Sequence, residues 1–288
     1  MSSSVKIPIK IAVQKEEEIE VTILTLESKK ISKNLRIVQL SDLHFGPCTN
    51  KKTISKAINI TNDLKPDLIT MTGDYVQFST TGIRHILATK VSPKLFKWTE
   101  YRREVRKLCK ELSTSLSKLE NLENTYATFG NHDYHEGLGT IVRQFPKNIN
   151  WLVNKTKDID SKNITISGLD DFRLGQPDLS SLKPRKDSFN LLLSHNPDAL
   201  MINKDRNELE KTALEKYDLV LCGHTHGGQI CLPNKKPIIS RTKQKSHIKE
   251  LSYQGNTPVY VTRGLGRGGL PIRLNCPAEI VLIQLKAV

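Results

Sequence analysis

Residues 35–44 read Leu-Arg-Ile-Val-Gln-Leu-Ser-Asp-Leu-His, a mostly apolar run that ends in a carboxylate and an imidazole. The run is short, which predicts a buried strand over Leu35–Leu40. Asp42 and His44 follow at alternate positions, so both side chains can reach one ion from the strand end. Loops at strand ends are where α/β proteins place their reactive groups. The stretch therefore predicts a strand with a ligand pair at its carboxyl end.

Four further blocks repeat this arrangement of an apolar run followed by donor groups. The predicted strands lie at 67–71, 125–129, 189–193 and 218–221. The donors that follow them are Asp74; then Asn131, His132 and Asp133; then His195; and finally His224 and His226. Their oxygen and nitrogen atoms, with no thiolate among them, suit Mn, Fe, Zn or Mg. Two cations about 3.5 to 4 Å apart could share this set and lower the pKa of a common water.

These five blocks, in this order, resemble the motifs of the calcineurin-like metallophosphoesterases. The resemblance implies an α/β fold, a four-layer αββα sandwich of two mixed β-sheets flanked by helices. It implies seven ligands for two divalent cations: Asp42, His44 and His226 for one, Asn131, His195 and His224 for the other, with Asp74 bridging. It also implies that His132 protonates the leaving oxygen or stabilises the phosphoryl group, and that Asp133 orients His132.

Residues 222–230, 263–266 and 271–273 are similar to the YaeI and YkuE branch of bacterial phosphodiesterases. That branch includes the chlamydial type of UDP-2,3-diacylglucosamine pyrophosphatase. The resemblance implies attack of metal-bound hydroxide on a phosphodiester or pyrophosphate. The specific expectation is hydrolysis of UDP-2,3-diacylglucosamine to lipid X and UMP in lipid A synthesis, with manganese as the first choice of cation.

Four further residues are expected to touch the substrate. Arg263, Arg267 and Arg273 lie among glycines that let the backbone approach a phosphate, and His135 directly follows the catalytic block. A solvated glycine-rich loop is the alternative explanation for the arginines. A binding protein without catalysis would be expected to have lost ligands, and all of them are present.

The chain carries 44 Lys and Arg against 30 Asp and Glu, a formal net charge of +14 that favours anionic partners. Expected partners are a phosphorylated, lipid-linked substrate and an anionic membrane surface, and no protein partner is indicated. A general membrane-associated phosphodiesterase and a metal-dependent nuclease remain alternatives. Nucleic acid is disfavoured because only 6% of residues are aromatic and no aromatic-basic surface for stacking bases is evident.

The five cysteines are scattered and odd in number, which argues against a disulfide frame and favours a reducing compartment. Residues 1–13 contain no unbroken apolar stretch of the length that a signal peptide or membrane span needs. The expected location is therefore cytoplasmic, with peripheral contact at the inner face of the membrane.

We expect an N-terminal strand or extension at 1–34 and a catalytic domain at 35–288, with a basic helical insertion at about 78–124. Apolar residues at steps of three and four from Tyr101 to Leu119 predict one long helix in the insertion. Residues 83–98, which mix apolar and basic side chains, favour either an ordinary covering helix or a lid that faces a membrane. A helix is also expected over 53–64, and further strands over 19–26, 163–168, 229–232, 258–262 and 279–285.

Overall fold

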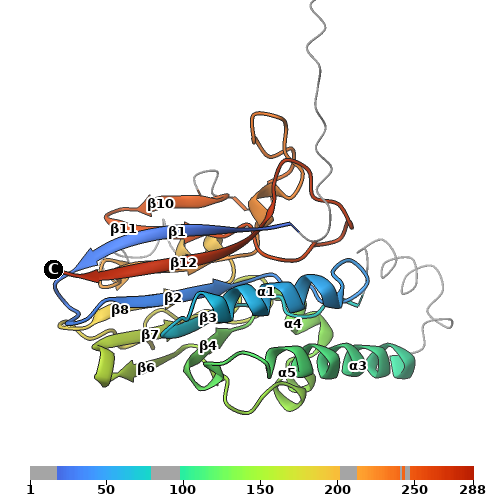
Figure 1. Ribbon diagram of the computed structural model, residues 1–288, viewed down its shortest axis with the longest axis horizontal. Coiled ribbons are helices and arrows are strands. Elements are labelled where there is room, and N and C mark those ends of the chain that lie inside the picture. The colour runs from blue at the N-terminus through green and yellow to red at the C-terminus, as the bar shows by residue number, and fades with distance from the viewer. Residues whose placement is uncertain (1–17, 79–97, 202–212, 241, 244–246) are drawn as a thin grey trace, which may run out of the picture.

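The computed structural model describes residues 18–78, 98–201, 213–240, 242–243 and 247–288. Two six-stranded sheets lie face to face at its centre (Figure 1). In spatial order, the first sheet contains β1 (Ile19–Ser28), β12 (Ala278–Ala287), β2 (Leu35–Leu40), β3 (Leu68–Thr72), β4 (Thr125–Thr128) and β5 (Asn150–Trp151). The second contains β10 (Glu250–Gln254), β11 (Thr257–Val261), β9 (Leu219–Cys222), β8 (Phe189–Leu193), β7 (Ile164–Gly168) and β6 (Lys155–Ile159).

Both sheets are mixed, and each has a parallel centre. The strands β2, β3, β4 and β5 run parallel in the first sheet, while β12 is antiparallel to β2. In the second sheet β11, β9, β8 and β7 run parallel, and β10 and β6 pair antiparallel at its edges. The carboxyl ends of parallel strands in one sheet share an edge, so the loops that follow them gather there.

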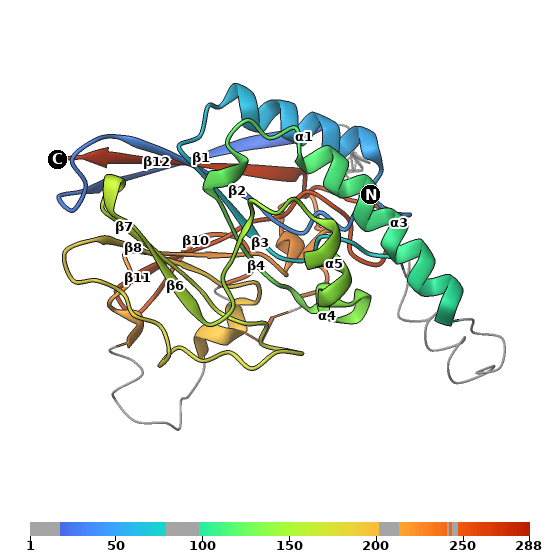
Figure 2. The same cartoon turned by 90° about the horizontal axis from the view of Figure 1, so that it is seen from below.

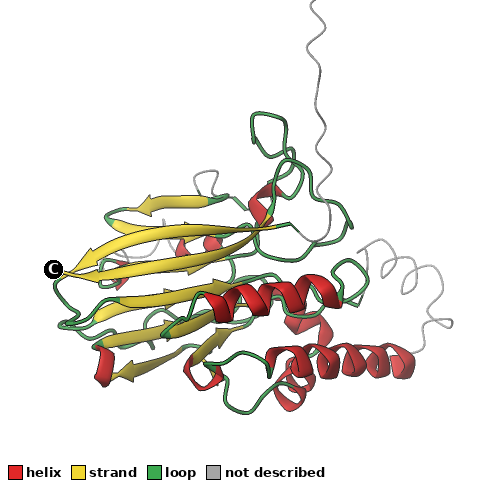
Figure 3. Ribbon diagram, in the orientation of Figure 1, coloured by secondary structure: helices red, strands yellow, loops and turns green. Residues whose placement is uncertain are grey.

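Helices cover the outer face of the first sheet (Figures 2 and 3). They are α1 (Lys51–Asp63), α3 (Trp98–Leu116), α4 (Asn131–Glu136) and α5 (Leu138–Gln144). Val38 of β2 packs on this side with Ile58 of α1 and Leu112 of α3, while Ile37, its neighbour in β2, packs between the sheets. This alternation is the two-residue period of a strand buried on both faces.

The outer face of the second sheet is covered by loops and a short 3-10 helix, η4 (Pro197–Met201), within the described residues. Leu192 of β8 and Val220 of β9 pack there against Ala199 and Leu214. Three more 3-10 helices, η2 (Leu122–Asn124), η3 (Asp160–Lys162) and η5 (His226–Gly228), lie in connecting loops. The expected α/β fold of two mixed sheets flanked by helices is confirmed.

One predicted strand is wrong. Residues 229–232 make only single bridges, Ile230 to Leu274 and Cys231 to Pro237, and belong to a loop. Gly227 and Gly228 turn the chain at positive φ just before it, and Gln229 itself has φ 58°, which is incompatible with an extended ladder. The apolar residues of this segment follow a tight turn and do not extend the second sheet.

The long helix of the predicted insertion is confirmed as α3. Val105, Cys109 and Leu112 form part of its buried stripe over the first sheet. Most of the segment expected to be a covering helix or a lid lies outside the described residues, at 79–97. The domain boundary at residue 34 stays a prediction, and β1, which precedes it, pairs in parallel with β12 along ten residues. Within the described part of the chain, no helix has the length and apolar character that crossing a membrane requires.

Candidate metal centre

The donor blocks lie in loops that hydrogen bonds hold together at the strand ends. The amide of Asp42 donates to the carbonyl of Gly73 over 3.0 Å, and the amide of His44 donates to the carbonyl of Asp74 over 3.0 Å. Gln39 of β2 links the two sheets, because its Nε2 donates to the carbonyl of Cys222 at the end of β9 over 3.0 Å. The loops of both sheets therefore meet at one place.

The backbone at the donors is unusual. Five non-glycine donors have positive φ: Asp42 (51°), His44 (41°), Asp74 (57°), His224 (69°) and His226 (55°). A non-glycine residue held in this region costs about 1–3 kcal/mol, and such residues concentrate at functional sites. The surrounding hydrogen bonds keep the strained turns in place, and the turns direct the side chains inward.

The first donor cluster contains Asp42, His44 and His226. Their donor atoms all lie within 4.8 Å of one another, and all three side chains are buried. Nε2 of His44 lies 3.0 Å from Nε2 of His226, which in turn lies 3.4 Å from Oδ1 of Asp42. Two imidazole nitrogens and a carboxylate oxygen thus converge on one point, as ligands of a cation do.

The second cluster contains Asp74, His195 and His224, whose donor atoms also lie within 4.8 Å of one another. Oδ2 of Asp74 lies 3.2 Å from Nε2 of His195 and 3.5 Å from Nε2 of His44, so it stands between the two clusters. Nδ1 of His195 lies 2.7 Å from the carbonyl of Thr72. Donation of the Nδ1 proton to that carbonyl would leave the Nε2 lone pair for a cation.

The side-chain oxygen of Asn131 indicates whether these residues fit a pair of cations. Its Oδ1 atom is buried and has no hydrogen-bond partner. An oxygen left in that state costs about 1–3 kcal/mol, so native proteins seldom keep one without a function. A divalent cation accepts such an oxygen as a ligand. The donor set, two carboxylates, four imidazoles and one amide, therefore fits two divalent cations.

The buried charges are strongly interdependent. Burial raises the pKa of Asp42 to about 6 even though His195 opposes the shift. Burial acts in the same direction on Asp74, but His195 and then His132 outweigh it and hold its pKa well below the usual range. Burial lowers the pKa of His195, but the charges of Asp74 and Asp42 outweigh burial and raise the pKa to about 10. A cation that binds here must therefore displace the proton of an imidazolium.

His132 lies at the edge of the centre, on the first turn of α4. Its amide donates to Oδ1 of Asp74 over 2.8 Å, and its half-buried ring stands edge-on to that of His44, with the centroids 4.8 Å apart. The ring is therefore in contact with the donor cluster and with solvent. This is the position that a group transferring a proton to a leaving oxygen needs.

Asp133 is fully buried, and its carboxylate accepts three backbone amides. The amides of Asp74 and Gly130 donate to Oδ2 and the amide of Tyr75 donates to Oδ1, each over 2.8 Å. Burial, with a further contribution from Asp74, raises its pKa well above the usual range. Asp133 therefore fastens the loop of Asp74 to the loop of Asn131, and its orienting effect on His132 stays a prediction.

Two glycines allow the close approach of these loops. A Cβ on Gly223 would lie 2.1 Å from Oγ of Ser41 and 2.3 Å from Oδ2 of Asp42, and a Cβ on Gly130 would lie 2.3 Å from Oδ1 of Asp74. Any side chain at these positions would displace a donor carboxylate. Gly130, directly before Asn131, and Gly223, directly before His224, are thus needed for the donor loops to pack this closely.

The predicted substrate-contacting arginines are buried and hold protein groups. Arg263 pairs with Glu279 over 2.9 Å and with Glu20 over 3.0 Å. Arg267 donates to the carbonyl of Cys48 over 3.2 Å. Nη2 of Arg273 donates to backbone carbonyls of residues 263, 264 and 266 over 2.6 to 3.0 Å. These contacts give the three side chains a role in shaping the loop, so we propose no substrate contact for them.

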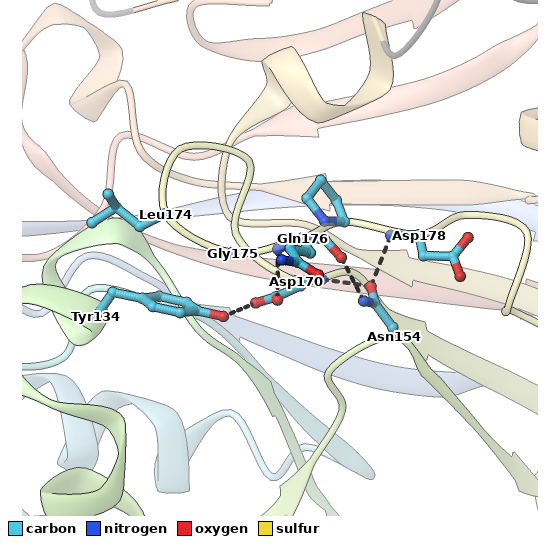
Figure 4. Close-up of a pocket in the computed structure, with 8 residues that line it drawn as sticks. Tyr134, Asn154, Asp170, Leu174, Gly175, Gln176 and Asp178 are labelled. Atoms are coloured by element: carbon cyan, nitrogen blue, oxygen red, sulfur yellow. Dashed lines mark hydrogen bonds between the residues drawn. The ribbon is translucent and has the colours of Figure 1, made fainter.

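A pocket of about 720 Å³ opens beside α4 (Figure 4). It is lined by Tyr134, Asn154, Asp170 and residues 174–178, and the hydroxyl of Tyr134 donates to Asp170. The neighbouring His135 is exposed, and its ring centroid lies 6.1 Å from that of His132. His135 therefore lies at the surface beside His132, and its contact with a substrate stays a prediction.

Asp171, which was not predicted, is fully buried next to this pocket. Its Oδ2 accepts the amides of Arg173 and Leu174, while its Oδ1 has no hydrogen-bond partner. Its charge contributes to the raised pKa of His195. The sequence contained a pattern that could have indicated Asp171, because Asp170 and Asp171 follow the predicted strand at 163–168 as the predicted donors follow their strands.

Comparison with known proteins identifies the family. The calcineurin-like phosphoesterase profile matches residues 35–228. The metallophosphoesterase YkuE of Bacillus subtilis is 33% identical, over 93% of this chain and 86% of its own, and the phosphodiesterase YaeI of Escherichia coli is 30% identical, over 87% and 82%. The solved structure of the calcineurin-like phosphoesterase YfkN from Bacillus subtilis gives a TM-score of 0.41 at 12% identity, over 80% of this chain and 81% of that one. From the profile match over most of its length and the similarity to YkuE and YaeI, the chain belongs to the calcineurin-like phosphoesterases, which are metal-dependent hydrolases.

Proposed function

We propose that this protein hydrolyses a phosphodiester or pyrophosphate bond at a centre of two divalent cations. Asp42, His44 and His226 would hold one cation, Asn131, His195 and His224 the other, and Asp74 would bridge them. The observation that supports this most is the position of Asp74 Oδ2, 3.5 Å from a nitrogen of the first cluster and 3.2 Å from a nitrogen of the second. A carboxylate between two convergent donor groups is suited to two cations and is poorly explained by one.

A bound pair of cations supplies Lewis acidity, which aligns the phosphate and activates water. The protein contributes orientation and proton transfer. The carbonyl of Thr72 fixes the ring of His195, and Asp133 fixes the loops of Asp74 and Asn131. His132 donates a proton to the leaving oxygen from the open edge of the centre, and His135 contacts the departing part of the substrate.

Manganese is the cation that we propose first, with Fe, Zn and Mg as alternatives. The donor set contains hard carboxylate and amide oxygens together with imidazoles and has no thiolate, which suits Mn²⁺. Metal is removed with a chelator, each cation is added back separately, and the cation that restores the highest hydrolytic activity identifies the preferred one.

The specific substrate that we propose is UDP-2,3-diacylglucosamine, cleaved at the inner face of the membrane to lipid X and UMP. Its pyrophosphate suits the two cations, and the net charge of +14 favours an anionic substrate and an anionic surface. Purified protein with Mn²⁺ should release UMP from this substrate faster than it acts on phospholipids, nucleotides or single-stranded DNA. Preferential cleavage of DNA would favour the nuclease alternative.

The roles of His132 and Asp74 are tested with two esters that differ in their leaving groups. The variant His132→Gln should lose about 10²- to 10⁴-fold in kcat on a dialkyl phosphodiester, whose alkoxide needs a proton. It should lose much less on bis(p-nitrophenyl) phosphate, because nitrophenolate leaves unprotonated.

The variant Asp74→Asn should slow hydrolysis of both esters by more than about 100-fold. Loss of a residue that only supports a metal ligand costs up to about that much, and Asp74 is proposed to bind the cations directly. Circular dichroism checks that both variants fold. Near-normal turnover by folded Asp74→Asn would refute the proposed centre, and equal losses of His132→Gln on both esters would refute the proton transfer.

A further inference from the structure

Five large aliphatic side chains are exposed on two loops beside the metal centre. One loop, 229–240, follows His226, and the other, 263–277, connects β11 to β12. The side chains are Leu232 (44% exposed), Ile238 (57%), Ile239 (62%), Leu270 (49%) and Ile272 (46%). We call these five residues the aliphatic patch. An exposed apolar surface of several neighbouring side chains marks an interaction site more often than isolated ones do.

Hydrogen bonds join the two loops into one surface. Gln229 is almost fully buried, and its Nε2 donates to the carbonyls of Leu270 and Ile272 over 2.9 and 3.0 Å. The amide of Cys231 donates to the carbonyl of Leu274 over 2.9 Å. In Figure 1 the loops, orange and red, project side by side beyond the strands. The five side chains therefore belong to one connected structure.

The same loops border the metal centre. Nη2 of Arg273, in the second loop, lies 3.4 Å from Nδ1 of His226, and Sγ of Cys276 donates to the carbonyl of His226 over 3.2 Å. A surface that binds the aliphatic patch is consequently held close to the cations that His226 would help to bind.

The charged residues within the two loops have one sign. Lys235, Lys236 and Lys243 are exposed, and the sequence has no Asp or Glu between 229 and 249 or between 263 and 277. Aliphatic side chains flanked by lysines suit the boundary between acyl chains and anionic headgroups. Single-stranded nucleic acid would call for aromatic stacking groups, and protein interfaces are typically enriched in aromatic residues and arginine.

We propose that the aliphatic patch and its flanking lysines dock on an anionic bilayer, so that the metal centre faces the headgroup plane. The substrate is then a membrane lipid that carries a phosphodiester or pyrophosphate. This second statement rests on the proposed function, while docking can be tested without hydrolysis.

The test is co-sedimentation of the full chain with vesicles of phosphatidylcholine, with and without phosphatidylglycerol. Wild-type protein should bind the anionic vesicles. The double variant Ile238→Ser/Ile239→Ser should bind them roughly tenfold more weakly, because each isoleucine loses the free energy of burial in the interface. Lys235→Ser/Lys236→Ser should weaken binding to anionic vesicles and increase its sensitivity to salt.

The matched control is Val21→Ser/Ile23→Ser on β1, where the side chains are 39% and 57% exposed but lie outside the patch. It should bind as wild type does. Equal losses in the control, unchanged binding of the isoleucine variant, or no vesicle binding by wild type would overturn the proposal. If wild-type protein is a dimer and the isoleucine variant is a monomer, the patch is a protein interface instead.

Turnover of bis(p-nitrophenyl) phosphate, which is soluble, should be the same in all these variants, so loss of docking is distinguishable from failure of the proposed chemistry.

Discussion

At the scale of single residues, the centre combines strained backbone with buried charge. Donors such as Asp42 and His224 adopt positive φ although neither is glycine, and the amide of His224 donates to the Asp42 carboxylate over 3.1 Å. Each strained turn is thus stabilised by the group that it positions. The local cost, about 1–3 kcal/mol per residue, is offset by hydrogen bonds to a carboxylate.

The raised pKa of His195 predicts that cation binding releases protons. With a pKa of about 10, this side chain is protonated at neutral pH, and a cation must displace the proton. The affinity for Mn²⁺ should therefore rise with pH, by up to tenfold per unit as long as the pH stays below that pKa. Calorimetric titration of chelator-treated protein in two buffers of different ionisation enthalpy measures the protons released. Identical heats in both buffers would contradict the prediction.

At the scale of elements, α3 supports the sheet that carries three donor loops. Its buried stripe packs against α1 and α5 in the core on the outer face of the first sheet, and the stripe contains no donor of the centre. The helix therefore contributes stability, while the loops at the strand ends contribute chemistry. This division is common in α/β proteins.

Truncation of the α3 stripe should destabilise the protein with little effect on chemistry. Leu112 is fully buried, so Leu112→Ala should lower the free energy of unfolding by about 2–5 kcal/mol. The exposed Lys110→Ala on the same helix should change it by less than about 0.5 kcal/mol. Guanidinium denaturation measures both. A large loss of kcat in folded Leu112→Ala, at a temperature where it is fully native, would show that α3 does more than support the sheet.

The elements differed in how well the sequence predicted them. Buried parallel strands such as β2 and β8 have apolar runs that end at a donor, and α3 has a clear helical period, so these were predicted correctly. The edge strands β6 and β10 are mostly polar, and their pairing depends on partners far along the chain. The loop at 229–232 was mistaken for a strand because its fold depends on two preceding glycines and on the buried side chain of Gln229.

The convergence of the donors could be predicted only in part. The position of each donor directly after an apolar run indicated the donors from the sequence, and motif resemblance supplied their division between two cations. The positive-φ turns at Asp42 and His44 were not predicted. The loop-shaping contacts of Arg273 could not be predicted, because they go to backbone carbonyls. The three amides bound by Asp133 were also missed, since backbone partners leave no pattern of side chains in the sequence.

At the scale of the whole molecule, Glu279 of β12 connects the two sheets. Its carboxylate, 1% exposed, accepts the hydroxyls of Thr22 on β1 and Tyr260 on β11 and pairs with Arg263. Burial alone would raise its pKa, but the charge of Arg263 and hydrogen bonds from Thr22 and Arg263 lower it below the usual 4.5. The charged carboxylate therefore stabilises the joined sheets.

Stability should depend on pH through this residue. Because the folded pKa is lowered, the contribution of Glu279 is complete above its unfolded value and is lost as the pH falls through the folded one. Glu279→Gln should lower the free energy of unfolding by about 3 kcal/mol at neutral pH. The difference from wild type should shrink in acid. Guanidinium denaturation at several pH values measures it, and a difference that does not change with pH would exclude this origin.

The position of β12 also affects how the chain is made. This strand lies between β1 and β2, the first two strands in the described part of the chain. Neither strand can therefore pair with β12 until the residues between Leu40 and Ala278 have been synthesised, although β2 can already pair with β3. Completion of the first sheet must therefore wait for synthesis of β12, and pairing between strands so far apart in the sequence is slow. During that interval the backbone edges of β1 and β2 that pair with β12 have no partner strand, which makes chaperone binding and low-temperature expression relevant to obtaining this protein.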